Sequence, residues 1–276
     1  MGPWIGPERI APVARRMRIR EERVASRRLS QAPLVSIVIV TFNAPDYVRR
    51  CLDSIEARTS IAHETIVVDN ASDAPTRALL AERAGRGTIR LVQREDNPLW
   101  AKACNQGLAL CDPRSRFVLL LNPDCEALAD DWVQRLAAVL DADPKVAVTG
   151  IALNWKRIGP VFGCVDGQCF FMRRAAFDEV GLLDAERYPW NGGPYDWCAR
   201  AFAKGWTYRL CANDPPFLVH HGQKSVAASG RAHPWRPVDV EEMYRRAGLA
   251  PTRPHRITVW WRRRFGPAYF FEPLRA

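Results

Sequence analysis

The chain has 276 residues, of which 47% are hydrophobic, so it can bury a substantial core in one large domain. Its formal net charge of +10 is concentrated at the ends, with 8 Arg against 3 Glu in residues 1–30 and 6 Arg against 1 Glu in residues 251–276. The rest is balanced in charge and carries no helix-turn-helix, zinc-finger or RNA-recognition pattern, so we expect no nucleic-acid partner.

Targeting signals and cysteine spacing indicate the compartment. No run approaches the roughly 18 consecutive apolar residues that span a bilayer, and residues 1–30 contain no apolar segment typical of a secretory signal. We therefore expect a cytoplasmic protein. Its 8 Cys are irregularly spaced, without a Cys-x-x-Cys pair, which favours reduced thiols packed as small hydrophobic side chains over metal or disulfide roles.

The sequence divides into three predicted segments: a basic N-terminal extension (1–32), a folded domain (33–226) and a basic aromatic tail (227–276). The domain begins with residues 35–40, which are apolar on both faces, as in a central parallel strand covered by helices. The next predicted elements are a helix over 46–58, a strand over 65–68, a helix over about 75–84, a strand over 89–92, a helix over 101–110 and a strand over 117–121. This alternation predicts βαβ units and a mainly parallel sheet.

The second half is less regular. It contains strand-like stretches at 168–172, 206–211 and 217–221, helices near 175–180 and over 195–204, and a loop rich in Gly, Pro and Trp at 188–194. The aromatic and flexible composition of that loop suits stacking on a sugar ring, although an ordinary hydrophobic anchor explains it equally well.

Polar residues follow three of the predicted strands. Because ligands bind outside the carboxyl ends of parallel strands, these tips form a candidate site. Each tip alone also suits a turn or a helix cap. The tips are Thr41 and Asn43, Asp69 and Asn70, and Asn122 and Asp124.

The chemistry of these side chains points to a nucleotide and a cation. Asp69, at a strand tip, is suited to hydrogen-bond a nucleobase or ribose. Asp124 follows a strand of pure aliphatic residues and is suited to hold a divalent cation against a pyrophosphate, with His220 as a second ligand. A buried structural histidine is the alternative for His220.

Together these patterns resemble glycosyltransferase family 2 over roughly residues 34–226. The matching strings, whose order and spacing carry the resemblance, are residues 35–43, 66–72, 97–107, 119–124, 166–174, 177–184 and 219–222. The resemblance implies an α/β GT-A fold with a mainly parallel central sheet flanked by helices. It also implies a donor site formed by Thr41, Asn43, Asp69, Asn97, Lys102, Asn122 and Asp124.

The metal motif departs from the family pattern. Asn122-Pro123-Asp124 stands where the family usually has Asp-x-Asp, a variant similar to the rhamnosyltransferase branch. The resemblance implies Mg²⁺ or Mn²⁺ as cofactor, with Asp124 and His220 as ligands. Losing one carboxylate weakens the expected affinity for the cation.

The segment expected to carry the general base departs further from the family pattern, because Gly193-Pro194 replaces the acidic pair that the family places before a helix. Three interpretations stay open. Asp196 is the base in a shifted loop, Asp166 supplies it, or the protein binds a nucleotide sugar without efficient transfer. Asp196 also suits a purely structural role at a helix N-terminus.

The resemblance implies inverting transfer of a sugar from a nucleoside-diphosphate sugar to a hydroxyl of a glycan or lipid-linked acceptor, in surface polysaccharide or glycolipid assembly. Residues 257–271 mix aromatic side chains with Arg, as in segments that contact anionic membranes. This predicts peripheral contact with the inner face of the plasma membrane. The alternative is that these aromatics pack back on the domain.

Overall fold

The computed structural model describes residues 34–151, 165–222 and 238–249. The first half alternates strands and helices: β1 (Val35–Thr41), α2 (Pro45–Arg58), β2 (His63–Asp69), α3 (Ala74–Gly85), β3 (Arg90–Gln93), α4 (Trp100–Leu108) and β4 (Phe117–Leu121). All seven were predicted from the sequence, with bounds that differ by at most two residues.

The second half holds β5 (Cys125–Ala127), α5 (Trp132–Asp141), β6 (Val146–Ile151), β7 (Cys169–Arg173), α6 (Arg174–Val180), α7 (Gly193–Ala203), β8 (Thr207–Cys211), β9 (Leu218–His220) and α9 (Val240–Arg246). Residues 125–151 supply β5, α5 and β6, none of which was predicted from the sequence. Helix α9, which lies within the segment assigned to the tail, was not predicted either.

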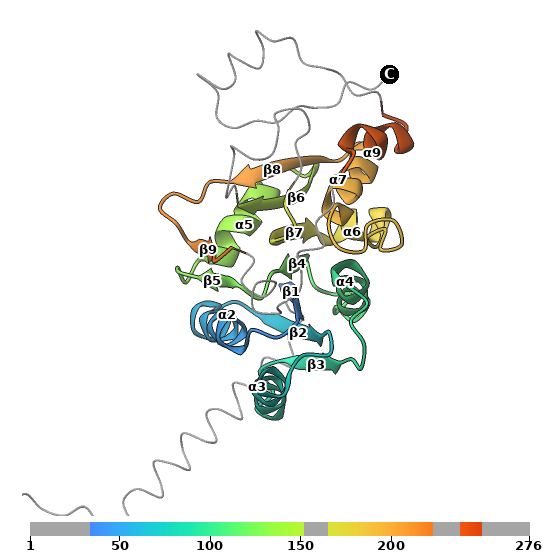
Figure 1. The fold of residues 1–276 in the computed structure, drawn as a ribbon. Coiled ribbons are helices and arrows are strands. Elements are labelled where there is room, and N and C mark those ends of the chain that lie inside the picture. Colours follow the sequence, from blue (N-terminus) through green and yellow to red (C-terminus); the bar gives the residue numbers. More distant parts are fainter. Residues whose placement is uncertain (1–33, 152–164, 223–237, 250–276) are drawn as a thin grey trace, which may run out of the picture.

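One seven-stranded sheet organises the fold, in the order β3-β2-β1-β4-β7-β6-β8 (Figure 1). The β1–β2, β1–β4, β2–β3 and β6–β8 pairs are parallel, whereas β7 runs antiparallel to β4 and β6. The predicted mainly parallel sheet is confirmed. A separate ribbon pairs β5 with β9 and lies beyond the end of β4.

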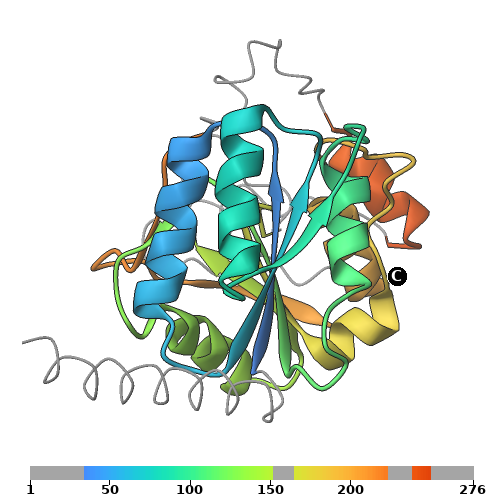
Figure 2. The same cartoon turned by 90° about the horizontal axis from the view of Figure 1, so that it is seen from below.

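Helices cover both faces of the sheet (Figure 2). Ile37 and Ile39 of β1 belong to the cluster formed with α2, α3 and α5, while Val38 and Val40 belong to the cluster formed with α4, α6, α7 and α9. Successive strand side chains point to opposite faces. This two-sided burial explains why β1 is apolar at consecutive positions.

Helix α4 approaches the sheet closely at Gly107, where an added Cβ would overlap Val38 and come within 3.3 Å of Val68. We expect Gly107→Ala to lower the free energy of unfolding by about 1–3 kcal/mol, because the packed core must shift to admit a methyl group. Urea unfolding tests this. Gly85→Ala is the matched control, since an added Cβ there has no atom within 4 Å. Equal effects at the two sites would contradict the prediction.

The seven cysteines in the described residues are all free and buried, and Cys164 lies outside those residues. Burial raises the pKa of Cys198 and Cys169 to about 12. These thiols remain protonated at neutral pH and are poor nucleophiles and metal ligands. Within the described part of the chain, the prediction of packed, reduced thiols is confirmed.

Within the described ranges, no helix is both long and apolar enough to cross a membrane. The N-terminal extension and the aromatic segment 257–271 lie outside those ranges. Helix α9 packs on α7, with the rings of Tyr244 and Phe202 6.0 Å apart and Met243 only 1% exposed. Residues 238–249 therefore pack against the folded domain, with Met243, Tyr244 and Leu249 buried.

Candidate active site

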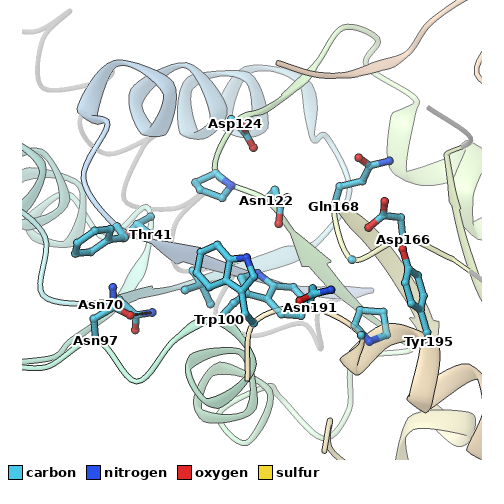
Figure 3. Close-up of a pocket in the computed structure, with 17 residues that line it drawn as sticks. Thr41, Asn70, Asn97, Trp100, Asn122, Asp124, Asp166, Gln168, Asn191 and Tyr195 are labelled. Atoms are coloured by element: carbon cyan, nitrogen blue, oxygen red, sulfur yellow. Dashed lines mark hydrogen bonds between the residues drawn. The ribbon is translucent and has the colours of Figure 1, made fainter. Parts of the chain in front are cut away.

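A pocket of about 220 Å³ opens at the carboxyl ends of β1, β2 and β4 (Figure 3). Thr41, Asn70 and Asn97 lie toward one end of it, and Asp166, Gln168 and Tyr195 lie toward the other. The pocket also meets the loop before α7 and the first turn of α4. The full lining is Val40, Thr41, Phe42, Asn70, Asn97, Trp100, Asn122, Pro123, Asp124, Asp166, Gly167, Gln168, Trp190, Asn191, Gly192, Pro194 and Tyr195.

The predicted base-reading residue Asp69 lies beneath the pocket and does not line it. Its carboxylate is fully buried, and Oδ1 accepts hydrogen bonds from Thr41 Oγ1 and the Ser72 amide, each at 3.3 Å. Oδ2 lies 3.8 Å from Arg77 Nε and accepts no hydrogen bond from the described residues. The neighbouring Asn43 is also absent from the lining, and its Oδ1 accepts from the Asp73 amide at 2.8 Å.

Asn70 faces the pocket in place of Asp69. Its Nδ2 donates to Leu99 O at 3.3 Å and to Asn97 Oδ1 at 3.4 Å, and Asn97 Oδ1 accepts the Leu99 amide at 3.0 Å. Leu99 has φ 71° and ψ −179°, a conformation that L residues rarely adopt. The two asparagines thus hold a strained backbone that starts α4 and places Trp100 in the pocket.

The predicted metal ligands meet, since His220 Nε2 lies 3.1 Å from Asp124 Oδ1. Asp124 is 2% exposed, and the side-chain nitrogen Nδ2 of Asn122 lies 3.4 Å from His220 Nε2. An oxygen and an imidazole nitrogen this close can bind the same Mn²⁺ or Mg²⁺, although hard cations favour the oxygen. Among the described residues no cluster of three or more His, Cys, Asp or Glu forms a complete metal site, so the protein offers part of a coordination shell.

Antiparallel pairing explains how these distant residues meet. Cys125 of β5 pairs with His220 of β9, and the His221 amide donates to Asp124 O at 2.9 Å. The next residues form a second acid–histidine pair, Glu126 with His221 at 2.9 Å, which does not line the pocket. The ribbon thus directs one of its two carboxylates to the site.

Of the two candidate bases, Asp166 lines the pocket. Burial raises the pKa of its carboxyl group, while nearby His220 and the backbone of Gly167 and Gln168 oppose this shift. A carboxylate whose pKa is raised in this way is a stronger proton acceptor than one in water.

Asp196 lies on α7, outside the pocket lining, and is 4% exposed. Arg200 Nε donates to its Oδ2 at 2.8 Å, and the same guanidinium donates to Val180 O and Leu182 O. This arrangement ties α7 to the end of α6. Such an ion pair suits the structural alternative that the sequence left open for Asp196, whose role as the base stays a prediction. Pro194 and Tyr195 of the same helix line the pocket.

The predicted donor residue Lys102 lies on α4, outside the pocket lining. Its Nζ pairs with Glu186 Oε1 at 2.9 Å. Its role in donor binding stays a prediction. The basic loop 223–225, which the sequence also suggested for phosphate, lies outside the described residues.

Sequence reasoning missed Trp100 and Gln168 as lining residues. Trp100 follows Asn97-Pro98 at the start of a helix, and an aromatic residue at that edge of the sheet was a usable signal. Gln168 is 8% exposed, and its backbone oxygen accepts the Asn122 amide at 2.9 Å. This antiparallel contact between β4 and β7 was not predictable from local pattern.

Comparison with known proteins agrees with this geometry. Residues 36–158 match the family model of glycosyl transferase family 2. The O-antigen biosynthesis protein RfbC of Myxococcus xanthus is 32% identical over 153 residues, which is 52% of this chain and 12% of RfbC. The chain spans only 12–23% of the length of the curated relatives it matches.

Solved structures share the architecture. The mannosyltransferase PcManGT from Pyrobaculum calidifontis, in complex with GDP-Man and Mn²⁺, has a TM-score of 0.55 at 17% identity, over 79% of this chain and 69% of PcManGT. TarS 1–349 from S. aureus, in complex with UDP-GlcNAc, has a TM-score of 0.54 at 17% identity, over 77% of this chain and 65% of that one. With its GT-A fold and the match over residues 36–158, the chain is similar to glycosyl transferase family 2 in both fold and sequence.

Proposed function

We propose that this protein is an inverting glycosyltransferase that moves a sugar from a nucleoside-diphosphate sugar to a hydroxyl of a glycan or lipid-linked acceptor. The observation that carries the proposal is the pocket at the carboxyl ends of β1, β2 and β4, with Asp124 and Asp166 in its lining. The match to RfbC supports a place in the assembly of surface polysaccharide.

The nucleotide is assigned to the end of the pocket near β2. Asn70 lines this end, and its Oδ1 is buried and accepts no hydrogen bond from the described residues. Buried polar atoms without partners are uncommon, so this oxygen suits an N–H group of a nucleobase. Thr41 and Asn97 flank this end, and Trp100 offers a flat ring against which a sugar could stack.

Asp124 and His220 would hold a divalent cation, with the donor diphosphate and water completing its shell. Such a cation stabilises the negative charge of a departing nucleoside diphosphate. PcManGT was solved with Mn²⁺ and a nucleotide sugar, which supports the same pairing here.

Asp166 is the proposed general base. As the acceptor oxygen attacks the anomeric carbon, Asp166 takes the hydroxyl proton, a new C–O bond forms, and the bond from that carbon to the diphosphate oxygen breaks. Attack from the side opposite the leaving group inverts the anomeric configuration. Asp196 is less suited, because it is tied to Arg200 and lies outside the pocket lining.

A second function is favoured by Pro194, which lines the pocket where the family usually carries an acidic residue. In this alternative the protein binds a nucleotide sugar without efficient transfer. Both functions require donor binding, and turnover separates them.

The test is binding and hydrolysis of UDP-, dTDP- and GDP-sugars with and without Mn²⁺ or Mg²⁺. We expect one donor to bind at least about 10-fold more tightly with metal than in EDTA, and to be turned over when a matching acceptor is present. Metal-dependent binding without acceptor-dependent turnover would favour the second function. Binding of no donor would contradict both.

A further inference from the structure

Helix α9 lies directly behind the pocket loop, defined here as residues 188–195. Gly192 lines the pocket, with φ 95°. A Cβ added at Gly192 would lie 3.1 Å from Met243 Cε, 3.1 Å from Tyr188 Cδ1 and 3.2 Å from Val238 Cγ1. At this point a single glycine therefore separates the pocket from the segment that carries α9.

One side chain of α9 ties down the start of this loop. Arg246 Nη1 donates to Tyr188 Oη at 2.9 Å, and the guanidinium carbon lies 5.9 Å from the centre of the Tyr188 ring. Arg246 Nη2 also lies 3.6 Å from Asp184 Oδ2. Asp184 in turn accepts the Tyr188 amide through its backbone oxygen at 2.9 Å, so the three residues form one cluster.

The other contacts of the loop connect it to the lining. Pro189 O accepts the Ala101 amide at 2.9 Å, in the first turn of α4, next to Trp100. Gly192 O accepts the Asp196 amide at 2.9 Å, which starts α7. The loop thus spans from the Arg246 cluster to two helices whose first residues line the pocket.

We propose that Arg246 is a positioning residue, which sets the shape of the pocket loop through Tyr188 and Asp184 without itself lining the pocket. Contacts that hold a loop from behind decide how often it leaves its native arrangement. A planar guanidinium can bond the tyrosine hydroxyl through one nitrogen and face the carboxylate with another, whereas a lysine ammonium offers a single nitrogen. Removing it should loosen the loop and weaken ligand binding more than it slows bond formation.

The experiment compares Arg246→Ala with Arg245→Ala in the full chain. Arg245 is the neighbouring arginine, and its Nη1 pairs with Glu242 Oε2 at 2.8 Å on the exposed side of the same helix. Amide hydrogen exchange of Tyr188 and Ala101 reports on the loop directly. We expect exchange at both amides to accelerate about 10-fold in Arg246→Ala and to stay unchanged in Arg245→Ala. Amides of β1 should be unaffected in both variants.

Two further variants keep the test decisive if Arg246→Ala folds poorly. Tyr188→Phe removes only the hydroxyl and should accelerate exchange by a smaller factor than Arg246→Ala. In the double variant, Tyr188→Phe should add less to the exchange rate than it does in the wild type, because its bond to Arg246 is already lost. Arg246→Lys should restore part of the protection. Unchanged exchange at Tyr188 and Ala101 in both Arg246→Ala and Tyr188→Phe, or an equal change in Arg245→Ala, would overturn the proposal.

The kinetic readout rests on the proposed function, and the exchange readout does not. If the protein transfers sugar, Arg246→Ala should raise KM about 10-fold with a smaller change in kcat. A loosened loop in a protein that binds no nucleotide sugar would overturn the proposed function and leave the positioning role standing. Normal transfer kinetics with unchanged amide exchange in Arg246→Ala would overturn the positioning role and leave the proposed function standing.

Discussion

Asp124→Asn is expected to abolish metal-dependent donor binding and to lower kcat/KM on the order of 1000-fold. The carboxylate is 2% exposed and lies 3.1 Å from His220 Nε2, so the substitution removes the one charged oxygen ligand from the proposed cation site. Asparagine has nearly the same shape as aspartate. The loss should therefore appear in cation affinity and not in folding.

Glu126→Gln is the matched control. Glu126 lies two residues away, pairs with His221 in the same ribbon, and does not line the pocket. Both substitutions remove one negative charge and one acid–histidine contact. Calorimetry of donor binding with Mn²⁺ and with EDTA should separate them, with metal dependence lost only in Asp124→Asn. If Asp124→Asn keeps the metal dependence of the wild type, the assignment of the cation site is wrong.

Asp166→Asn is expected to lower turnover about 100-fold or more while donor affinity stays near that of the wild type. Asparagine cannot take the proton of the acceptor hydroxyl. Asp166 lies toward the end of the pocket remote from Thr41 and Asn97, so the nucleotide end should be undisturbed (Figure 3). The measurement is kcat with saturating acceptor, together with the donor dissociation constant.

The same substitution has a second signature in stability. Burial raises the pKa of Asp166, so ionising it costs the folded state free energy, and stability is lost as pH rises through the raised pKa. Asparagine removes that cost. In EDTA, the free energy of unfolding of Asp166→Asn relative to wild type should therefore grow from acidic to neutral pH. A relative stability that falls over this range would contradict the burial of an ionised carboxylate.

Asp196→Asn provides the contrast. It breaks the 2.8 Å contact with Arg200 and leaves a half-buried guanidinium without its carboxylate, so it should destabilise the protein at neutral pH. Turnover per folded molecule should change little. If Asp196→Asn instead abolishes turnover while Asp166→Asn remains active, the two roles must be exchanged.

Local pattern predicted the first half of the fold well. The β1 and β4 strands are apolar on both faces because they are central and covered by helices on both sides, so a short hydrophobic run identifies them. The same logic placed Thr41, Asn70, Asn122 and Asp124 at one edge of the sheet, and all four line the pocket. Residues 125–151 went without prediction, because β5 has only three residues and β6 pairs with partners distant in sequence.

Side-chain roles within the site depended on contacts that sequence spacing does not encode. Asp69 and Asn70 are adjacent at one strand tip, yet strand alternation buries the first and turns the second into the pocket. The sequence favoured Asp196 over Asp166 as the base, whereas the structure places Asp196 beside Arg200 and outside the pocket lining. The position of α9 behind Gly192 brings together residues about fifty positions apart.

By itself, the sequence determined the α/β class, the parallel first half of the sheet and the sheet edge at which the pocket opens, because these follow from hydrophobic periodicity and from polar residues at strand ends. Only the tertiary structure decided which carboxylate faces the pocket, how Asp124 meets His220, and that Arg246 supports the loop. Those features depend on the packing of segments far apart in the chain, where an ion pair or one missing Cβ decides which way a side chain points.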